Sequence, residues 1–509
     1  MTQGAPLQLY DSFKREIRRF EPIDPENTRV YSCGPTVYNY AHLGNLRAYV
    51  FTDTLSRVLT WKGYPLTHII NITDVGHLTS DADAGDDKME AAARAQAKSI
   101  WDIARHYTEA FKQNLSDLNI RTPSRWSVAT DHIAEMIAFA EVIAPKHCYE
   151  LDSGLYFDVT TVPDYGRLAR TVEDEGESRI DPVAGKRNAA DFAIWRKSGP
   201  GESRQMEWDS PWGMGAPGWH LECSVMSHKY LGEQFDIHTG GIDHREIHHP
   251  NEIAQNQAHS CTPHTGANFW MHNNFLVARN TDGRGAKMSK SSGGFTTLQS
   301  IIDRGIHPLA YRLMCLSAHY RSELEFSGEN LLAALTRLKR MVIGIETLKS
   351  RHAELVSASI SSPSDSSRKW TLKQVQGDES FVDAQHRAVM NEFDEVISKD
   401  LNTPMALSLL EGMLSSKRVD PLTRLKMADA MDAVLGLNLT TLSRTDLRIR
   451  PKTASITEAE IEARLDQRQE ARAAKDFAAS DALRDALIAD GVEIMDGDPL
   501  RWDWKISLD

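Results

Sequence analysis

The sequence predicts an α/β protein: a doubly wound parallel sheet, a subdomain inserted between the two halves of the sheet, and an all-α region at the C-terminal end. Two observations lead to this fold class. Apolar, β-favouring runs alternate with helical patterns over residues 29–75 and again from about residue 218 to 277, and the stretch between them changes character. From Leu298 onward the patterns are almost wholly helical.

The first half of the sheet begins with a strand, a loop and a helix. Residues 30–33 form an apolar run that Gly34 ends, and a helical pattern with one buried face follows over about residues 46–61. A second strand is expected at residues 68–73. A long helical pattern then covers residues 89–118.

Residues 125–207 are expected to form the insertion, because short alternating strands such as residues 154–159 replace the strand–helix pattern. The sheet is expected to resume with a strand at residues 218–223. Further strands are expected at residues 235–238 and around 269–277, with a helix between them. The two halves of the sheet are therefore separated in the chain by the whole insertion.

Length and composition indicate the class of protein. The chain has 509 residues, too many for one core, with 41% hydrophobic and 25% charged residues, as in ordinary globular proteins. A formal net charge of −13 argues against indiscriminate nucleic-acid binding but allows a local basic face. The five cysteines are scattered, so we expect no disulfide framework and a reducing cytoplasm. No run is long enough to span a membrane, and residues 1–6 lack the pattern of a signal peptide.

Two polar motifs have residue types that suit polyphosphate. His42, Gly44 and Asn45 lie where a helix is expected to start, and a helix N-terminus offers free backbone N–H groups and the positive end of its dipole. Lys287 and Lys290 lie in a glycine-rich loop that could close cationic donors around phosphate. A capped turn and a solvated charged loop are the alternatives when each motif is considered alone.

Another group of residues has the chemistry of metal ligands. Cys33, Cys223 and the pair His248 and Glu252 lie at expected strand or helix ends, and the pair, four residues apart, shares one side of a helix. Two thiolates, an imidazole and a carboxylate suit tetrahedral zinc. His249 is a rival to His248, but it lies about 100° round the helix, so both are not expected to bind. The spacing alone leaves the metal interpretation open, because it contains no compact Cys-x-x-Cys pair.

Together, the motifs at residues 42–45 and 287–291 resemble the paired signatures of class I aminoacyl-tRNA synthetases. Residues 31–38, 217–224 and 248–252 in turn resemble cysteinyl-tRNA synthetases. The resemblance runs from about the seventh residue to the 327th, and more loosely through the helical C-terminal region.

Two departures from that family stand out. Pro250 occupies a place that is usually glutamate, and proline is tolerable in the first turn of a helix, which we therefore expect to start near His249. After Asp74, residues 75–81 replace the usual acidic run, which puts the contacts of that loop in doubt.

The resemblance implies a Rossmann-type catalytic domain, split into residues 1–124 and 208–297 around a connective insertion at 125–207. It also implies a helical stem-contact region at 298–350 and a helical anticodon-binding domain at 381–509. Residues 351–380 are rich in serine and have no counterpart in that family, so they are expected to form a linker or exposed insertion.

The implied reaction has two steps. The carboxylate of L-cysteine attacks the α-phosphate of ATP, with Mg²⁺, to give cysteinyl-adenylate and pyrophosphate, and the 3′ end of tRNA(Cys) then accepts the cysteine. One zinc ion per chain, on Cys33, Cys223, His248 and Glu252, would bind the substrate thiol and make an editing domain unnecessary. The expected partners are tRNA(Cys), L-cysteine and ATP, with no membrane, and the chain is expected to be a monomer.

The resemblance also gives roles to single residues. The expected catalytic residues are His42, Asn45, Lys287 and Lys290. The expected ATP-binding residues are His42, Gly44, Asn45, Gly240, Gly241, Asp243 and Lys290. The expected lining of the cysteine pocket is Cys33, Gly34, Thr73, Trp219 and His238.

The C-terminal region carries candidate tRNA contacts. A basic cluster is formed by Arg444, Arg448, Arg450 and Lys452, and Trp502 and Trp504 could stack on bases. A solvated charged turn and two packed tryptophans are equally open. The other cysteines, Cys148, Cys261 and Cys315, are expected to be structural.

Two other functions remain open. A ligase of the same catalytic fold that joins activated cysteine to an amino-sugar should lack an anticodon domain, whereas a long helical region follows the catalytic part here. An inactive, synthetase-like RNA-binding protein is disfavoured by the intact His42, Lys290 and candidate zinc ligands.

Overall fold

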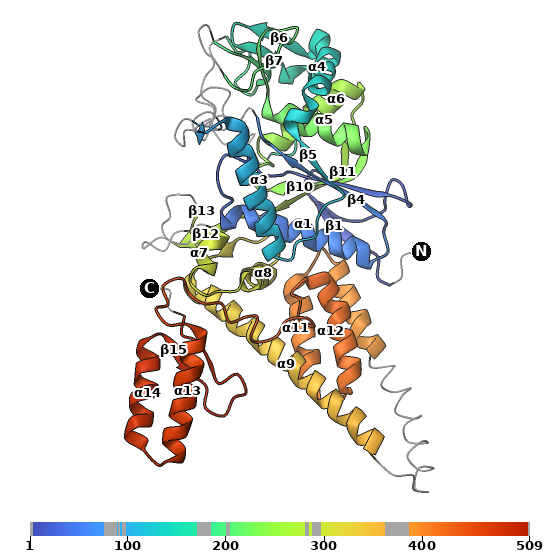
Figure 1. Ribbon diagram of the computed structural model, residues 1–509. Coiled ribbons are helices and arrows are strands. Elements are labelled where there is room, and N and C mark those ends of the chain that lie inside the picture. Colours follow the sequence, from blue (N-terminus) through green and yellow to red (C-terminus); the bar gives the residue numbers. More distant parts are fainter. Residues whose placement is uncertain are drawn as a thin grey trace.

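The computed structural model describes residues 4–75, 89, 92–93, 98–169, 185–199, 204–279, 285–287, 297–361 and 386–506. At its centre lies a five-stranded parallel sheet with the strand order β11-β10-β3-β4-β5 (Figure 1). These strands are β3 (Thr28–Ser32), β4 (Leu66–Ile72), β5 (Arg125–Val128), β10 (Phe235–Gly241) and β11 (Ala267–Asn273). The order reverses between β3 and β10, which confirms the doubly wound α/β fold. Such folds bind ligands beyond the carboxyl ends of the strands at this point.

Four helices connect and cover the sheet: α1 (Leu43–Trp61), α3 (Ile100–Asp117), α5 (Trp219–Leu231) and α6 (His248–Ser260). The prediction of a strand at residues 218–223 is wrong, because helix α5 begins there. All residues from 220 to 227 are buried, so this helix has no polar face in that stretch. Its sequence therefore lacks the periodicity that distinguishes a surface helix from a buried strand.

The insertion contains a second, four-stranded antiparallel sheet. Its elements are η1 (Ala129–His132), α4 (Ile133–His147), β6 (Cys148–Leu151), β7 (Gly154–Phe157), η2 (Val159–Thr161), β8 (Phe192–Lys197) and β9 (Gly215–Pro217). The expected limits of 125 and 207 are both shifted. Residues 125–128 pair with β4 in the central sheet, and β9, beyond residue 207, pairs with β8 in the insertion. Pairing partners that are distant in sequence set these limits, and local composition does not show them.

Smaller elements surround the central sheet. They are β1 (Gln8–Asp11), β2 (Glu16–Arg19), β12 (Leu276–Arg279), β13 (Gly285–Lys287), α7 (Leu298–Ile302), α8 (Pro308–Leu316) and β14 (Leu324–Glu325). β12 pairs with both β13 and β14. The three-stranded sheet that results lies directly after β11, where it borders the carboxyl edge of the central sheet.

Three further helices are α9 (Gly328–Ser361), α11 (Thr403–Ser415) and α12 (Pro421–Leu435). Helix α9 continues to Ser361, so the expected linker does not begin at residue 351; its remaining part, 362–380, lies outside the described residues. Phe393, Ile397 and Leu401 belong to the same buried core as the central sheet. The region that begins near residue 386 is therefore continuous with the body of the protein.

The last part of the chain has a small core of its own. It comprises α13 (Glu458–Ala473), α14 (Phe477–Ala489), β15 (Val492–Ile494) and β16 (Trp502–Trp504). The hairpin β15–β16 is an exception to the all-α prediction. In the view of Figure 1 these helices lie on the opposite side of α9 from α11 and α12. Trp502 and Trp504 are 0% and 3% exposed and pack in this core, so the prediction that they stack on bases is wrong.

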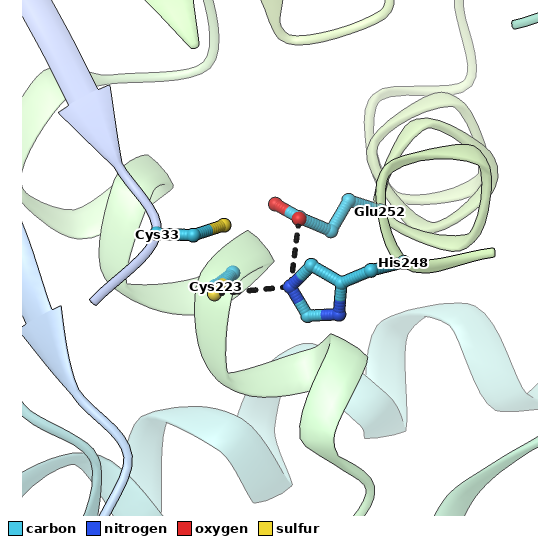
Figure 2. Close-up of side chains that lie close together, drawn as sticks. All are labelled: Cys33, Cys223, His248 and Glu252. Carbon is cyan, nitrogen blue, oxygen red and sulfur yellow. Dashed lines mark hydrogen bonds and ion pairs between the residues drawn. The ribbon is translucent and has the colours of Figure 1, made fainter. Parts of the chain in front are cut away.

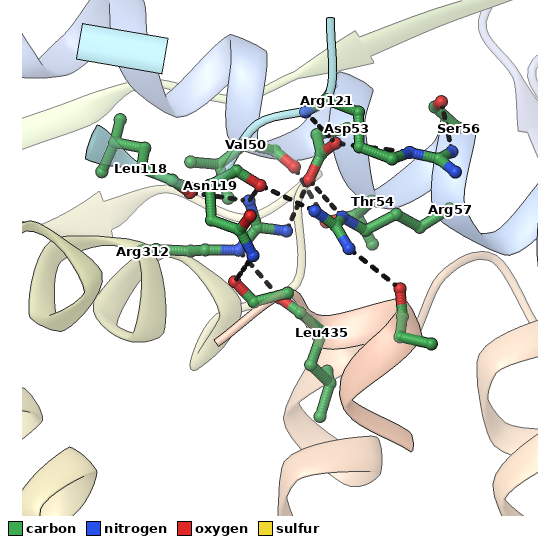
Figure 3. A network of polar contacts seen from close by, with 12 residues as sticks. Val50, Asp53, Thr54, Ser56, Arg57, Leu118, Asn119, Arg121, Arg312 and Leu435 are labelled. Carbon is green, nitrogen blue, oxygen red and sulfur yellow. Dashed lines mark hydrogen bonds and ion pairs between the residues drawn. The ribbon is translucent and has the colours of Figure 1, made fainter. Parts of the chain in front are cut away.

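A buried polar network joins the helical region to α1 (Figure 3). The Asp53 carboxylate lies 2.6 Å from Arg312 Nη2 and 2.7 Å from Arg57 Nε. Although burial opposes it, these two guanidinium groups lower the pKa of Asp53. Arg312 Nε also donates to the carbonyl of Leu435 at the end of α12. Gly436 follows with φ +67°, and a Cβ there would lie 2.5 Å from Arg312 Nη2, so both the turn and the close approach require glycine.

Among the described residues, no helix is both long enough and apolar enough to cross a membrane.

Candidate active site

A cavity of about 280 Å³ opens beyond the carboxyl ends of β3 and β10. Cys33 and Gly34, directly after β3, line one part of it, and Gly241 and Asp243, at and after the end of β10, line another. The N-terminus of α1 borders the cavity through His42. The candidate phosphate site and one member of the candidate metal site, Cys33, therefore line the same cavity.

Four potential metal ligands lie together beside this cavity: Cys33, Cys223, His248 and Glu252 (Figure 2). Cys33 lines the cavity, whereas the other three are buried and do not line it. One ligand atom from each residue lies within 4.8 Å of the others. His248 Nε2 is 3.4 Å from Cys223 Sγ and 3.0 Å from Glu252 Oε1. The four residues come from three elements that are far apart in sequence, as predicted, but Cys223 lies in the second turn of α5 and not at a strand end.

Helix α6 places His248 and Glu252 on one side, one turn apart. It begins at His248, one residue before the expected start. Pro250 lies in the first turn, where the backbone N–H groups have no partner within the helix, so proline removes no helical hydrogen bond. The unusual residue at this position is therefore compatible with the ligand geometry.

The charges within this group are those of a cation site. A hydrogen bond from Cys33 is the main cause that lowers the pKa of Cys223 to about 6, while burial raises the pKa of Cys33. Burial opposes ionisation of Glu252, but His238 and His248 lower its pKa to about 2. Burial also opposes protonation of His248, but Glu252 and Cys223 raise its pKa to about 10. His248 therefore lies between two acidic side chains, and a metal ion bound by the group would take the place of a proton on its ring.

The donor set fits zinc. The carboxylate of Glu252 is held from one side by His238, whose Nε2 lies 2.9 Å from Oε2. Its other oxygen, Oε1, is buried and faces His248 Nε2 at 3.0 Å. Thiolate, imidazole and carboxylate ligands are those of protein zinc sites, and an outer histidine that orients a ligating carboxylate is typical of them.

The rival ligand His249 is also close. His249 Nε2 lies 3.4 Å from Cys33 Sγ, and a second group of Cys33, His238, His249 and Glu252 is equally compact. His249 Nδ1, however, is paired with His272 Nε2 at 2.8 Å in a fully buried row of rings. The second group lacks Cys223, so it offers one thiol where the first offers two.

Helix α1 is capped by the first candidate motif. The backbone N–H of Asn45 donates to His42 Nδ1 at 3.1 Å, and the backbone N–H of His42 donates to Asn45 Oδ1 at 3.2 Å. In the neutral ring the proton must then be on Nε2, because Nδ1 accepts. His42 and Asn45 thus form the capped turn that was one interpretation of this motif. His42, Gly44 and Asn45 also line the cavity, where they could contact a ligand.

Known proteins are similar to this chain over nearly its whole length. The family model described as the class I (C) tRNA synthetase catalytic domain matches residues 19–336. A cysteine–tRNA ligase of Novosphingobium aromaticivorans is 61% identical and covers 99% of this chain and 98% of its own. The corresponding protein of Zymomonas mobilis is 57% identical with the same coverage. The chain belongs to the cysteine–tRNA ligase family.

A solved structure agrees at the level of the fold. Methionyl-tRNA synthetase of Mycobacterium tuberculosis, bound by methionyl-adenylate, is 12% identical, with a TM-score of 0.50. The similarity covers 81% of this chain and 90% of that one. The class I architecture expected for a cysteine–tRNA ligase is therefore present.

Not every residue expected in the ligase pocket lies there. Trp219 lines the cavity, and its ring stacks on His248 with centroids 4.1 Å apart. His238 does not line it but lies behind Glu252, stacked on Trp270. Thr73 is also outside the lining; Asn71 Nδ2 donates to its hydroxyl at 3.0 Å.

The glycines of the site have steric roles. The backbone N–H of Gly34 donates to Asn71 Oδ1 at 2.7 Å, and a Cβ at Gly34 would lie 1.5 Å from the Asn71 carbonyl oxygen. Gly241 and Asp243 line the cavity at and after the end of β10. Gly240 does not line it, and a Cβ there would lie 2.7 Å from His244 Nδ1 and 2.8 Å from His249 Cε1.

The lysine-rich loop lies largely outside the described residues. Lys290 is among the omitted residues, and Lys287 is described only by its backbone, which pairs with Val277 in the sheet of β12 and β13. One described flank of the loop lines the cavity, and the other pairs with a residue that lines it. Leu276 lines it, and Thr297 forms a β-bridge with His42.

Sequence reasoning missed His220, which supports the candidate ligand His248. Its Nδ1 lies 2.9 Å from His248 Nδ1, and its Nε2 lies 2.9 Å from Asn251 Nδ2. The only signal in the sequence is that His220 lies three residues before Cys223, on the same face of a helix. Because that helix was predicted as a strand, the relation could not be seen.

Proposed function

We propose that this chain is an ATP-dependent ligase that activates L-cysteine as cysteinyl-adenylate, releases pyrophosphate, and transfers cysteine to the 3′ end of tRNA(Cys). Membership of the cysteine–tRNA ligase family supports the overall reaction. The observation that carries the proposal is the cluster of Cys33, Cys223, His248 and Glu252, because Cys33 of this cluster lines the same cavity as the N-terminus of α1.

We propose that ATP lies between α1 and the end of β10, with Mg²⁺ on its phosphates. The free N–H groups and positive dipole end of α1 favour the phosphates, and His42 Nε2 can donate to them. Gly44 and Asn45 form the same turn, while Gly241 and Asp243 border the adenosine. Lys287 and Lys290 would neutralise the leaving pyrophosphate from the loop whose flanks border the cavity.

Zinc on Cys33, Cys223, His248 and Glu252 would supply a Lewis acid that binds the substrate thiol as thiolate. Serine and alanine could not make that bond, so an editing domain would be unnecessary. His238 and His220 would orient the ligands Glu252 and His248, and Trp219 would form a wall of the cysteine pocket against His248. The protein's part in the chemistry is then positioning and charge stabilisation.

One assay tests the proposed reaction. Pyrophosphate exchange into ATP should depend on cysteine among the common amino acids, and the purified chain should charge tRNA(Cys). Exchange with cysteine but transfer to an amino-sugar instead of tRNA would favour the amino-sugar ligase. Absence of exchange with every amino acid would favour the inactive RNA-binding protein.

We propose that the C-terminal part binds tRNA, but the basic cluster needs a revised role. Arg444 bridges Glu346 and Asp498 at 3.0 and 2.9 Å. The guanidinium carbon of Arg448 lies 3.7 Å above the Trp502 ring. The C-terminal module comprises α13, α14, β15 and β16, residues 458–504. Both arginines therefore attach this module to the rest of the protein. Arg450 and Lys452 remain on the surface, and the Lys452 side chain is 77% exposed.

Removal of the chain after residue 452 should leave cysteine-dependent exchange within a few-fold of the full chain. It should raise the KM for tRNA in charging by roughly tenfold or more, because the module's own phosphate contacts are lost although Arg450 and Lys452 stay. The module has its own core, so its loss exposes little of the main one. Truncation near residue 380 is not equivalent, since it removes Phe393 and Ile397 from the main core and should prevent folding. Equal charging by the 452-residue variant and the full chain would contradict a tRNA role for the module.

A further inference from the structure

One side of the cavity is lined by aromatic rings that have no assigned role in the proposed activation of cysteine by ATP. Tyr49, Tyr107 and Phe111 line it and are 5%, 7% and 2% exposed. Tyr40 lines it too, but is 48% exposed. A large apolar ring half open at the mouth of a substrate cavity is a surface for a planar ligand.

The Tyr40 ring is exposed yet fixed. Its hydroxyl lies 3.0 Å from His106 Nε2. The ring also meets Tyr107 edge to face, with centroids 4.9 Å apart and planes at 89°. A ring held in this way loses little conformational freedom when a ligand stacks on it, so stacking would be favoured over that on a freely rotating side chain.

Tyr40 lies on the opposite side of β3 from Gly241 and Asp243, the proposed border of the adenosine of ATP. The loop after β3 bridges to Thr73 at the end of β4, and Tyr40 then packs on α3, the helix before β5. Gly241 and Asp243 follow β10, which pairs with the other edge of β3. The cavity therefore has a β10 side and a β4–β5 side, with Cys33 between them.

The proposed reaction requires two nucleosides around one carbonyl group. In transfer, a ribose hydroxyl oxygen of the terminal adenosine bonds to the carbonyl carbon, the bond from that carbon to the adenylate phosphate oxygen breaks, and AMP leaves as the hydroxyl proton passes to a phosphate oxygen. The adenosine of the adenylate occupies the β10 side in our assignment. The base of the second nucleoside must then lie on another side of the same carbonyl.

We propose that Tyr40, supported by His106 and Tyr107, is the stacking platform for the base of the terminal adenosine of tRNA. The proposal rests on the proposed function and names a binding subsite of it. Tyr40 binds and does not react; His106 is a positioning residue, because it acts through the Tyr40 hydroxyl. Base–aromatic stacking in protein complexes with single-stranded nucleic acid is strong enough to matter for affinity.

The test compares two tRNAs and three proteins. The tRNAs are tRNA(Cys) with its terminal adenosine and the same molecule trimmed by that one nucleotide. The proteins are the full-length wild type, Tyr40→Leu, which keeps bulk but loses the ring, and Tyr40→Phe, which keeps the ring but loses the bond to His106. Dissociation constants for both tRNAs, the KM for tRNA in charging, and cysteine-dependent pyrophosphate exchange are measured.

Wild type should bind the complete tRNA more tightly than the trimmed one, by about tenfold on the scale of one base–aromatic stack. Tyr40→Leu should bind the two equally, while Tyr40→Phe should keep most of the difference. In Tyr40→Leu, the fold-increase in the KM for tRNA should be about ten times larger than any fold-decrease in the rate of cysteine-dependent pyrophosphate exchange. His106→Ala should act in the same direction as Tyr40→Leu, but more weakly.

Three outcomes would overturn the platform. Tyr40→Leu could retain the wild-type preference for complete tRNA, or it could raise the KM for ATP in exchange as much as the KM for tRNA, which would place the adenylate base on this ring. Loss of preference in Tyr40→Phe as large as in Tyr40→Leu would show that the hydroxyl, and not stacking, binds. Exchange by the wild type with cysteine checks the proposed function separately, since it needs no tRNA.

Discussion

Replacement of Cys223 by serine should remove zinc from the purified protein and lower kcat/KM for cysteine-dependent exchange by roughly 1000-fold or more, on the scale of losing a buried group that recognises the substrate. Cys223 is 2% exposed, and its thiol lies 3.4 Å from His248 Nε2. A serine hydroxyl at this position has a much higher pKa than a thiol, so it would not supply the anionic ligand that zinc requires.

Cys261→Ser is the matched control, because Cys261 is an exposed thiol at the end of α6, outside the four-residue group. It should keep both zinc and activity. Zinc content is measured by elemental analysis, and folding by circular dichroism. Full zinc and full exchange in Cys223→Ser would remove this residue from the ligand set and would favour the group that contains His249.

A second large effect is expected from His42→Asn, which should lower the rate of adenylate formation by roughly 100-fold, the scale of one lost transition-state donor. Asparagine is a favourable N-cap residue, so the cap of α1 should be kept while the ring and its Nε2 donor are lost. The melting temperature should therefore change little, and the KM for cysteine should change less than kcat.

His42→Ala separates the two roles of this side chain. It removes the donor and also the acceptor for the Asn45 backbone N–H, so it should lose activity like His42→Asn and destabilise the protein by about 1 kcal/mol in addition. Pre-steady-state measurement of adenylate formation with thermal denaturation distinguishes these effects. An active His42→Asn variant would make His42 a helix cap and nothing more.

The general architecture could be predicted because most elements carry apolar patterns that favour one kind of secondary structure. The strand that ends before Cys33 and the helix that follows His42 were both expected, and both are present. Helix α5 was not, because its residues 220–227 are buried on all sides and show no polar face. Burial of this kind removes the helical period, and the position of Cys223 was misjudged as a result.

The candidate ligands could be named from residue types and family resemblance, but their supporting residues could not. His238 was expected to line a pocket, whereas it holds Glu252 from behind. His220 gave almost no signal, because its relation to His248 exists only after α5 and α6 pack together. Trp502 shows the reverse case: an aromatic residue near basic ones suggested base stacking, yet it is in a core.

The central claim is that the four-residue group holds zinc and that the metal reads the thiol of the substrate. X-ray absorption at the zinc edge of the purified full-length protein tests it most directly, with no amino acid, with cysteine and with serine. The account predicts two sulfur ligands at about 2.3 Å without substrate, three with cysteine, and two with serine. A sulfur count that stays at two on saturation with cysteine would contradict it, and Trp219 and its surroundings would then have to select the amino acid.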